Sequence, residues 1–387
     1  MKHFISVIFI GALFVTNSFA QENYKDLHTN NDYTSAGRNS VISGLDNSRG
    51  RSSAKNIILL IGDGMGTSQI YSALIANGGQ LNITQMPVSG FSKTYSFDQL
   101  ITDSGAGGTA LSSGVKTNNG AIGVDEKGEP VTSILEYAEQ YKKATGLVAT
   151  SAITHATPAS FIAHAVSRSS YEDIAADFLK VDIDLFIGGG EKHFDSRADG
   201  RNLLDSLRAK GYDVAFDLLA LNELKKSKIA VLTAPEHNGK YSERGDYLEK
   251  ATAFAISHLN KQRGGFFLMV EGSQIDWGCH QNDTDYAVGE TLDFDKAVGE
   301  ALRFAVVDKN TLVIVTADHE TGGMAITGGD MSKGYVQAQF ATGNHSAVMV
   351  PVFAYGPGSQ YFTGVFENTD VFVKMMKVFG FSTNNRK

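Results

Sequence analysis

Side chains of the kinds that bind metal ions follow one strongly apolar segment of the chain. Glu271, Asp276 and His280 lie within ten residues, directly after the apolar residues 266–270. Several carboxylates with several imidazoles suit zinc, whereas a hydroxyl with carboxylates and water suits magnesium. The stretch therefore predicts part of a site that holds both kinds of ion.

Three further apolar runs are followed at once by Asp, His or Thr. The runs and the residues that follow them are 57–61 with Asp63, 147–150 with His155 and Thr157, and 312–316 with Asp318 and His319. Apolar runs of this length are typical of strands covered on both faces in a parallel sheet. Ligands of such sheets bind beyond the carboxyl ends of the strands. We therefore expect four strand ends to deliver these side chains to one rim.

A serine at the start of a small-residue segment is the candidate nucleophile. Residues 102–110 read TDSGAGGTA and lead into a predicted helix, with Ser104 near its beginning. Backbone N–H groups and the positive end of the helix dipole favour an anion at such a position. A serine that only caps the helix is the simpler interpretation that the residues alone leave open.

Several of these features also have structural interpretations. The glycines of residues 62–66, GDGMG, do not have the spacing of a dinucleotide-binding turn, while Asp318 with His319 could be a hydrogen-bonded pair or a cap. His164 lies four residues before Arg168, and we predict a structural role for it. Three histidines in polar or helical surroundings are predicted to be ordinary surface residues: His193, His237 and His258.

Composition limits the class of protein. The 387 residues are 42% hydrophobic, enough for a large core, and the formal charge of −8 without Lys/Arg runs argues against a nucleic-acid surface. Residues 1–20 have the basic start, apolar segment and small final residues of a cleavable signal peptide. A membrane anchor is the alternative, but the apolar segment is shorter than the ~18 residues of a span. We expect a periplasmic or secreted protein without a membrane span after cleavage.

The rest of the chain is predicted to form one domain. Residues 21–55 are polar and are predicted to be a mobile leader. Residues 56–387 alternate apolar runs with helical patterns, for example 133–143 and 247–259, which predicts an α/β fold. Its central sheet should be doubly wound and mostly parallel, with helices on both faces. The polar residues 197–244 are interpreted as a surface excursion.

Taken together, the motifs resemble those of the alkaline phosphatase family. The matching segments, in the family's order, are IGDGMG, TDSGAGGTA, THATPASFIAHAVSR, EGSQIDWGCH, TADHETGG and GNHS. The resemblance covers nearly the whole predicted domain. It implies hydrolysis of phosphate monoesters through a phosphoserine, which releases inorganic phosphate and an alcohol, and a possible homodimer.

The resemblance also implies roles for individual residues. Two Zn²⁺ and one Mg²⁺ are expected in each subunit, with Ser104 as the nucleophile and Arg168 as the residue that grips the substrate phosphate. The implied ligands are Asp276, His280 and His345 for the first zinc, Asp63, Asp318 and His319 for the second, and Asp63, Thr157 and Glu271 for the third ion. A planar guanidinium suits two phosphate oxygens at once.

Three positions depart from the well-known enterobacterial members. His155 stands at the third site in place of Asp, and Trp277 stands near the expected phosphate position in place of Lys. These differences leave the identity of the third metal and the hold on phosphate open. Cys279 is not expected to be a ligand, because immediate neighbours of a ligand are poorly directed for coordination.

Three alternative functions remain from the sequence. A related phosphodiesterase would more commonly use Thr than Ser104 as its nucleophile. A sulfatase needs a Pro/Ala-x-Arg pattern after its modified residue, and the residues after Cys279 lack it. An exported phosphate-binding or metal-binding protein would have a similar rim without the chemistry.

Overall fold

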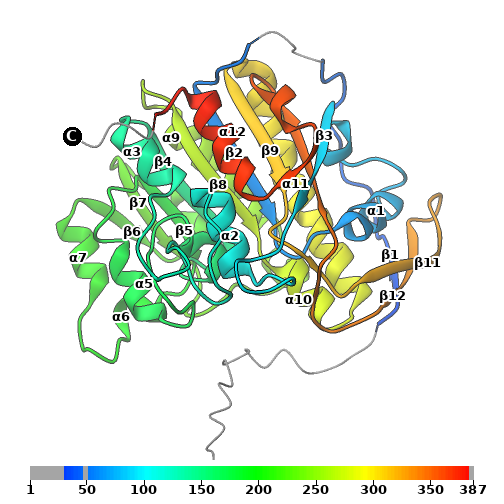
Figure 1. Cartoon of the computed structure of the whole chain (residues 1–387), viewed down its shortest axis with the longest axis horizontal. Helices are drawn as coiled ribbons and strands as arrows, with labels where there is room; N and C mark the ends of the chain where they lie inside the picture. Colours follow the sequence, from blue (N-terminus) through cyan, green and yellow to red (C-terminus); the bar gives the residue numbers. More distant parts are fainter. Residues whose placement is uncertain (1–29, 47–50, 383–387) are drawn as a thin grey trace, which may run out of the picture.

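A ten-stranded sheet forms the centre of the protein, whose computed structural model describes residues 30–46 and 51–382 (Figure 1). Its strands, in spatial order, are β15 (Gly364–Glu367), β3 (Val88–Lys93), β14 (Val350–Tyr355), β9 (Thr311–Thr316), β2 (Asn56–Gly62), β8 (Phe266–Gly272), β4 (Ala144–Ala152), β5 (Leu185–Gly189), β7 (Lys228–Leu232) and β6 (Tyr212–Ala215). Only β14 runs antiparallel to its two neighbours. The predicted α/β fold with a mostly parallel sheet is confirmed.

The four apolar runs named from the sequence all lie in strands of this sheet, namely β2, β4, β8 and β9. Burial on both faces explains their composition, because every residue of β2, β4, β8 and β9 is buried. β14 has the same composition although it is antiparallel, because it lies inside the sheet between β3 and β9. Apolar runs therefore report burial, and strand direction is decided by the connections.

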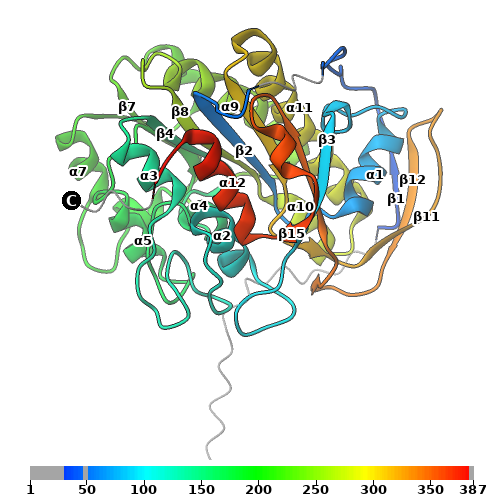
Figure 2. The same cartoon turned by 45° about the horizontal axis from the view of Figure 1, so that its top comes forward.

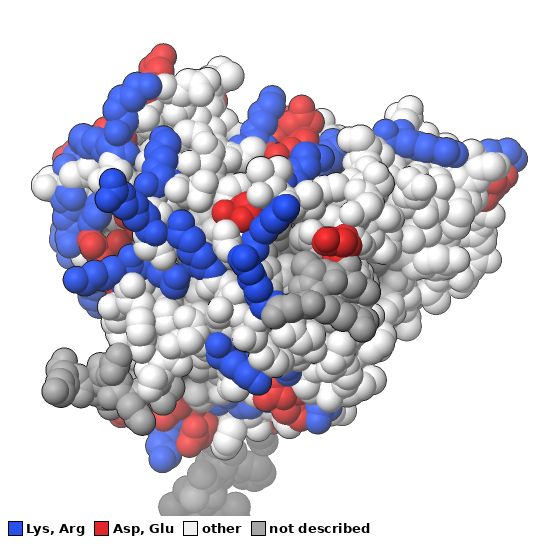
Figure 3. All heavy atoms as spheres, turned by 90° about the horizontal axis from the view of Figure 1, so that it is seen from above, with Lys and Arg blue, Asp and Glu red and all other residues white. Residues whose placement is uncertain are grey.

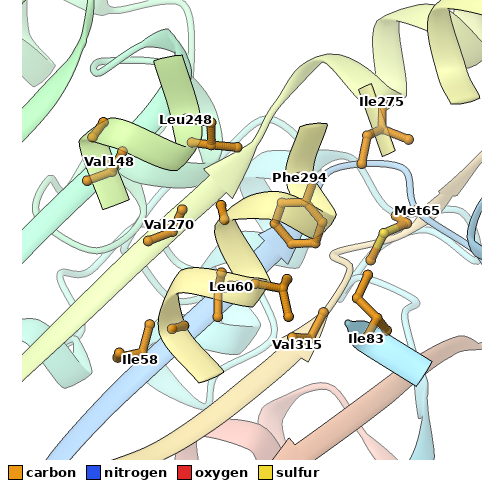
Figure 4. Packing of buried hydrophobic residues seen from close by; sticks show 14 of the residues in the cluster. Ile58, Leu60, Met65, Ile83, Val148, Leu248, Val270, Ile275, Phe294 and Val315 are labelled. Atoms are coloured by element: carbon orange, nitrogen blue, oxygen red, sulfur yellow. The ribbon is translucent and has the colours of Figure 1, made fainter. Parts of the chain in front are cut away.

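Helices cover both faces of the sheet, and the side chains of successive residues of β2 pack alternately against the two helical layers. Ile58 and Leu60 face a cluster that includes Leu248 and Phe294 (Figure 4), whereas Leu59 belongs to the opposite cluster. The first layer contains α1 (Thr67–Ala76), α9 (Tyr247–Leu259) and α11 (Thr284–Asp308). The second contains α2 (Ser104–Ser113), α3 (Ile134–Gln140), α5 (Tyr171–Asp177), α7 (Leu203–Ala209) and α12 (Thr369–Phe379).

The predicted leader is partly ordered. Strand β1 (Asp32–Thr34) pairs with β12 (Tyr335–Phe340), which pairs with β11 (Met324–Asp330), and this three-stranded sheet lies at one side of the molecule (Figure 2). Tyr33, Ile42 and Leu45 pack against the core. The prediction of a mobile segment is therefore wrong for residues 30–46, because isolated apolar side chains anchor it without a periodic pattern. The predicted signal peptide, residues 1–20, and residues 21–29 lie outside the described part of the chain.

Residues 197–244 are more than a surface excursion. They contain α7, β6, β7 and α8 (Tyr241–Arg244), and β7 and β6 extend the sheet by two parallel strands. The short apolar segment Ile229–Leu232 is fully buried, but polar residues on both sides hide it in the sequence. None of the helices in the described residues is both long and apolar enough to cross a membrane.

The excess of negative charge lies to a large extent inside the protein. Figure 3 shows a face on which Lys and Arg side chains gather toward one half, with Asp and Glu among them. Among the described residues, nine Asp or Glu are buried, whereas Arg197 is the one Lys or Arg in that class. Buried carboxylates need partners that compensate their charge. Cations in the interior would provide that compensation.

Candidate active site

The four strand ends meet as the sequence predicts. Asp63 follows β2, Asp318 follows β9, and the loop after β2 is fastened to its neighbours because Asp63 N donates to Gly272 O at 3.2 Å and Gly64 N to Asp318 Oδ1 at 3.3 Å. Gly64 has φ +71°, and a Cβ there would lie 2.8 Å from Asp276 Cα. Only glycine permits this turn and this close approach.

Asp276, His280 and His345 form the first ligand group. Helix α10 (Gln274–His280) places Asp276 and His280 one turn apart, and His280 Nε2 lies 3.3 Å from Asp276 Oδ2 and 3.1 Å from His345 Nε2. Both histidines donate from Nδ1 to backbone carbonyls, His280 to Gly343 O at 2.7 Å and His345 to Thr102 O at 2.8 Å. Each Nε2 is thereby directed to the common centre, as in histidines that bind metal.

The electrostatics of this first group suit a cation. Burial opposes a proton on His280, but the Asp276 carboxylate outweighs it and raises the pKa of His280 to about 9. Burial likewise opposes ionisation of Asp276, yet His280 and the other imidazoles hold its pKa well below the usual range. Positive charge is therefore favoured at this centre, and a proton and a metal ion would compete for the same Nε2 atom.

Asp63, Asp318 and His319 form the second group, with the predicted nucleophile beside it. His319 Nε2 lies 3.4 Å from Asp63 Oδ1, 3.3 Å from Asp318 Oδ2 and 3.2 Å from Ser104 Oγ. The three ligand side chains are fully buried. Burial, followed by repulsion from Asp276 and other carboxylates, raises the pKa of Asp318 to about 8, and burial with the Asp318 charge raises that of Asp63 as well.

Asp63, His155 and Glu271 form the third group, and Thr157 lies beside it. One ligand atom from each of the three lies within 4.8 Å of the others. Burial raises the pKa of Glu271 to about 7, although a hydrogen bond from Ser273 opposes the shift. Ligand atoms of Asp276, His319 and His345 also lie within 4.8 Å of one another, and this set bridges the first and second groups. The predicted ligands are therefore one continuous cluster.

Unsatisfied oxygens in this cluster provide a test of whether cations fit. Within the described part of the chain, the following buried atoms have no hydrogen-bond partner of normal geometry: Asp63 Oδ1 and Oδ2, Asp318 Oδ2, Glu271 Oε1 and Thr157 Oγ1. Polar atoms without a partner are rare in protein interiors. Carboxylate oxygens, a hydroxyl and imidazole nitrogens are the donor set of zinc and magnesium sites. The residues present fit these ions.

Ser104 and Arg168 lie at the start of α2. The N-cap residue Asp103 accepts from Ala106 N at 3.0 Å, and Arg168 Nη1 donates to Asp103 Oδ2 at 2.9 Å. Arg168 Nη2 also donates to His155 Nε2 at 3.3 Å. Burial opposes ionisation of Asp103, but Arg168 holds the pKa of that carboxyl below its usual value. The guanidinium is thus held charged between the serine helix and the third group.

A hydroxyl that the sequence did not single out joins two groups. Thr321 Oγ1 donates to Asp276 Oδ1, and His319 Nδ1 lies 3.2 Å from Thr321 Oγ1. Because the hydroxyl proton points to Asp276, His319 must donate from Nδ1, which leaves its Nε2 for the second group. The β10 (Glu320–Thr321) and β13 (His345–Ser346) pair holds Thr321 opposite His345. No sequence signal beyond its position after Asp318 and His319 could have identified it.

The predictions for the isolated histidines were partly wrong. His193 and His258 are buried, and His193 stacks on Tyr171 with ring centroids 4.7 Å apart. His237 is half-buried beside the site, where its ring lies 4.7 Å from that of Trp277. A histidine without neighbours of its kind in the sequence gives no sign of such packing.

His164 has the structural role that we predicted, although its segment is not an α-helix. Its Nδ1 donates to Gly123 O at 2.6 Å, and its Nε2 lies 3.3 Å from Glu136 Oε1. Cys279 is fully buried, and burial raises the pKa of its thiol well above the usual value. A protonated thiol directed toward Gln69, at 3.5 Å from Nε2, does not belong to the ligand cluster.

The parts define a class of protein. An open α/β sheet whose carboxyl end gathers cation ligands, a helix-terminal serine and a charged arginine is organised for metal-dependent hydrolysis of phosphate esters, since such transfers depend on positioning and on positive charge.

Comparison with known proteins identifies the family within that class. A family model described as alkaline phosphatase matches residues 54–339. Alkaline phosphatase 4 of Bacillus subtilis is 37% identical over 401 residues, which cover 82% of this chain and 87% of the relative. The structure of alkaline phosphatase from the Antarctic bacterium TAB5 has a TM-score of 0.82 at 44% identity and covers 86% of this chain and 100% of that chain. The chain belongs to the alkaline phosphatase family and hydrolyses phosphate monoesters, which confirms the resemblance and the predicted hydrolysis of phosphate monoesters.

The structure of a variant of the TAB5 enzyme contains a metal ion. This histidine-to-aspartate variant, with magnesium bound in its M3 site, has a TM-score of 0.82 at 43% identity and covers 86% of this chain and 100% of that chain. The family and this neighbour imply that metal ions are cofactors of the present chain.

Proposed function

We propose that the chain hydrolyses phosphate monoesters through a phosphoserine on Ser104, at a site for two zinc ions and one magnesium ion. The observation that carries the proposal is the 3.2 Å separation between Ser104 Oγ and His319 Nε2, beside Asp63 and Asp318. The first zinc is assigned to Asp276, His280 and His345, the second to Asp63, Asp318 and His319, and magnesium to Asp63, Thr157 and Glu271 with His155.

The residues of the chain divide the work of the reaction. Bound zinc and magnesium would supply positive charge that lowers the pKa of a nearby hydroxyl and stabilises charge on a departing oxygen. Ser104 Oγ attacks phosphorus, the alcohol leaves, and water then cleaves the phosphoserine to release phosphate. The N-terminus of α2 favours the negative charge that develops beside Ser104. Few groups of the cluster would contact the alcohol, which predicts broad substrate tolerance.

Arg168 holds the phosphate during both steps. Its guanidinium is fixed by Asp103 at 2.9 Å and carries donors in a planar fork that matches two phosphate oxygens. Because Asp103 keeps it charged and oriented before substrate arrives, little reorganisation is needed when the phosphate binds. Arg168 is therefore assigned to both catalysis and substrate binding.

His155 is assigned to the third metal site, and Trp277 is assigned to the region where the substrate phosphate binds. A neutral imidazole makes this group less anionic than a carboxylate would, so zinc could replace magnesium there. The magnesium in the M3 site of the histidine-to-aspartate variant of the TAB5 enzyme supports a link between a change of this kind and magnesium binding in a similar enzyme. Trp277 leaves the phosphate with one cation fewer than a lysine would provide.

The nucleophile is tested by replacing Ser104 with Ala. We expect the loss of nearly all hydrolysis of p-nitrophenyl phosphate, with metal content and folding unchanged. Activity within about tenfold of the wild type would exclude covalent catalysis by Ser104, since an activated nucleophile contributes far more than tenfold. Preference of the wild type for bis(p-nitrophenyl) phosphate would favour a diesterase instead, and binding of phosphate without turnover would indicate a binding protein.

We further propose that the chain is exported to the periplasm or beyond and forms a homodimer. Export rests on the signal-peptide pattern of residues 1–20. The dimer rests on the family resemblance and on exposed apolar side chains just before Ser104, namely Phe97, Leu100 and Ile101, which are 58%, 74% and 44% exposed. Fractionation of the cells and light scattering of the purified protein test the two proposals.

A further inference from the structure

His237 lies on a loop that is fastened to two elements of the site. The loop follows β7, and its backbone and side chains contact the ends of β4 and α10. Ala152 N donates to His237 Nδ1 at 3.0 Å, and Gln274 Nε2 donates to Asn238 O at 2.9 Å. β4 leads into His155, and α10 carries Trp277. The loop therefore connects the two elements that supply these residues to the third site.

The loop is also closely packed against the sheet. A Cβ on Gly189, in the neighbouring strand β5, would lie 2.0 Å from Glu236 O and 3.3 Å from His237 Cα. Asn238 N donates to Thr150 O at 3.3 Å, and Thr233 Oγ1 donates to Asn238 Oδ1 at 2.8 Å. These contacts hold the backbone on both sides of His237, so its ring is held in a defined place.

Three rings meet at nearly right angles beside the third group. The His237 ring lies 4.7 Å from that of Trp277 at 75° and 5.7 Å from that of His155 at 87°. The His155 and Trp277 rings lie 6.0 Å apart at 83°. Edge-to-face contacts of this kind stabilise the relative orientation of aromatic rings. Because an N–H group can only donate, the hydrogen bond from Ala152 also fixes which nitrogen of His237 presents its lone pair.

Ring orientation has more influence here than at a site built from carboxylates alone. A carboxylate has two oxygens and several lone pairs with which it can bind an ion, whereas a neutral imidazole binds through one nitrogen, in the plane of its ring. A rotation of His155 would move its ligating nitrogen relative to the ligand oxygens of Asp63 and Glu271, which complete the third group. The groups that orient a ligating histidine commonly affect metal affinity tenfold or more.

We propose that His237 is a positioning residue of the third metal site, which orients His155 for the ion and Trp277 for the bound phosphate. The proposal rests on the proposed function, because it needs the third site. His237 is not itself a ligand, since the third group comprises Asp63, His155 and Glu271. Replacement of His237 should therefore affect the third ion and phosphate while leaving the two zinc ions in place.

The test uses the zinc-loaded enzyme with His237→Ala, which removes the ring, and His237→Asn, which keeps an acceptor for Ala152 N–H. Elemental analysis after dialysis against graded magnesium concentrations gives the affinity of the third site, and the zinc content is measured in the same samples. Trp277 is the only tryptophan of the chain, so intrinsic fluorescence reports directly on its surroundings. The inhibition constant of inorganic phosphate is measured in parallel.

His258 in α9 offers a matched control, because it contacts the chain just before β7 begins. His258 is a buried histidine whose Nε2 donates to Ser227 O at 2.8 Å and whose ring stacks on Phe254 at 5.9 Å. His258→Asn should lower the melting temperature without changing the affinity for magnesium, the fluorescence response to magnesium, or the phosphate inhibition constant. A loss of stability alone therefore cannot imitate the expected result.

Both His237 variants are expected to bind magnesium about tenfold or more weakly, with two zinc ions per chain, a changed Trp277 emission and a higher phosphate inhibition constant. Magnesium affinity within about twofold of the wild type in either variant would overturn the role of His237 and leave the proposed function intact. Absence of a third ion from the wild-type enzyme would overturn the third site and this proposal together. A zinc content below two ions per chain in the His237 variants would also contradict it, because the effect would then not be specific to the third site.

Discussion

Thr321→Val is expected to weaken zinc binding at the first group and to lower catalytic efficiency. The threonine hydroxyl donates to Asp276 Oδ1 and accepts from His319 Nδ1, which lies 3.2 Å away, so one oxygen orients a ligand of each proposed zinc site. Valine has nearly the shape of threonine but no hydroxyl. The substitution therefore removes the two hydrogen bonds while it keeps the packing against Gly64.

The magnitude follows from the charge of the partners. A hydrogen bond to a charged group contributes about 1.5–3 kcal/mol, and a buried donor such as His319 Nδ1–H that is left unsatisfied costs about 1–3 kcal/mol. Part of this cost is the same in the metal-free and the zinc-bound protein, and this part does not change the zinc affinity. We therefore expect a loss of about 1.5–3 kcal/mol in zinc binding, or about 10- to 150-fold in affinity, since 1.4 kcal/mol is tenfold. This range agrees with the effect of removing groups that orient metal ligands.

The assay is competition for zinc against a chromogenic chelator, together with kcat/KM for p-nitrophenyl phosphate at saturating zinc. Thr321→Ser is the matched control, because it retains the hydroxyl and should stay within about threefold of the wild type. If Thr321→Val binds two zinc ions as tightly as the wild type and has the same kcat/KM, the hydroxyl does not orient the ligands and the reasoning is refuted.

Three further outcomes are expected. Trp277→Lys should tighten inhibition by phosphate about fivefold or more, because a charge ~6 Å away at an effective dielectric near 20 contributes roughly 1–3 kcal/mol to phosphate binding. A double-mutant cycle with His155→Asp separates the effects of the two positions. An unchanged inhibition constant would place Trp277 away from the phosphate. Chelation should abolish activity and lower the melting temperature together, because ions that bind only the folded state stabilise it, and full activity of a sample shown by elemental analysis to be metal-free would reject the three-ion site. In the metal-free protein, burial raises the pKa of Glu271 to about 7 and that of Asp318 to about 8. The folded state then binds more protons than the unfolded state, so the free energy of unfolding should fall as pH rises from about 4 through 8. Urea midpoints that rise over this interval would contradict the assignment.

Much of the fold was predictable because long apolar strands report their own burial. Strand β3 (Val88–Lys93) was not predicted, because two of its buried positions are Gly90 and Ser92 while Phe91 is exposed, so its sequence shows no apolar run. β6 and β7 are short and lie among polar residues. The order of the strands and the direction of β14 depend on contacts between distant segments, which no local pattern records.

The same division applies to the site. Asp63, Glu271 and Asp318 could be predicted because they end apolar runs, and the rule that ligands bind at strand ends brings them together. His345 follows no such run, and only the family resemblance pointed to it. Thr321 and His237 act through neighbours that the fold brings beside them. Residues of this kind have no type or spacing that distinguishes them in the sequence.

The position of β14 links the joining of the two parts of the sheet to completion of the proposed metal site. β14 joins β3 and β15 to β9 and the rest of the sheet, and it begins only five residues after His345. His345 and β14 are synthesised near the end of the chain. The partner of β1 is also synthesised late, because Asp32 pairs with Gln337, about 300 residues further along the chain. Contacts so distant in sequence make folding slow, because the entropy of closing long loops precedes the gain from pairing. Nascent chains that stop before residue 345 therefore lack both β14, which joins the two parts of the sheet, and a proposed zinc ligand, so tight metal uptake can serve as a sign that β14 has been synthesised.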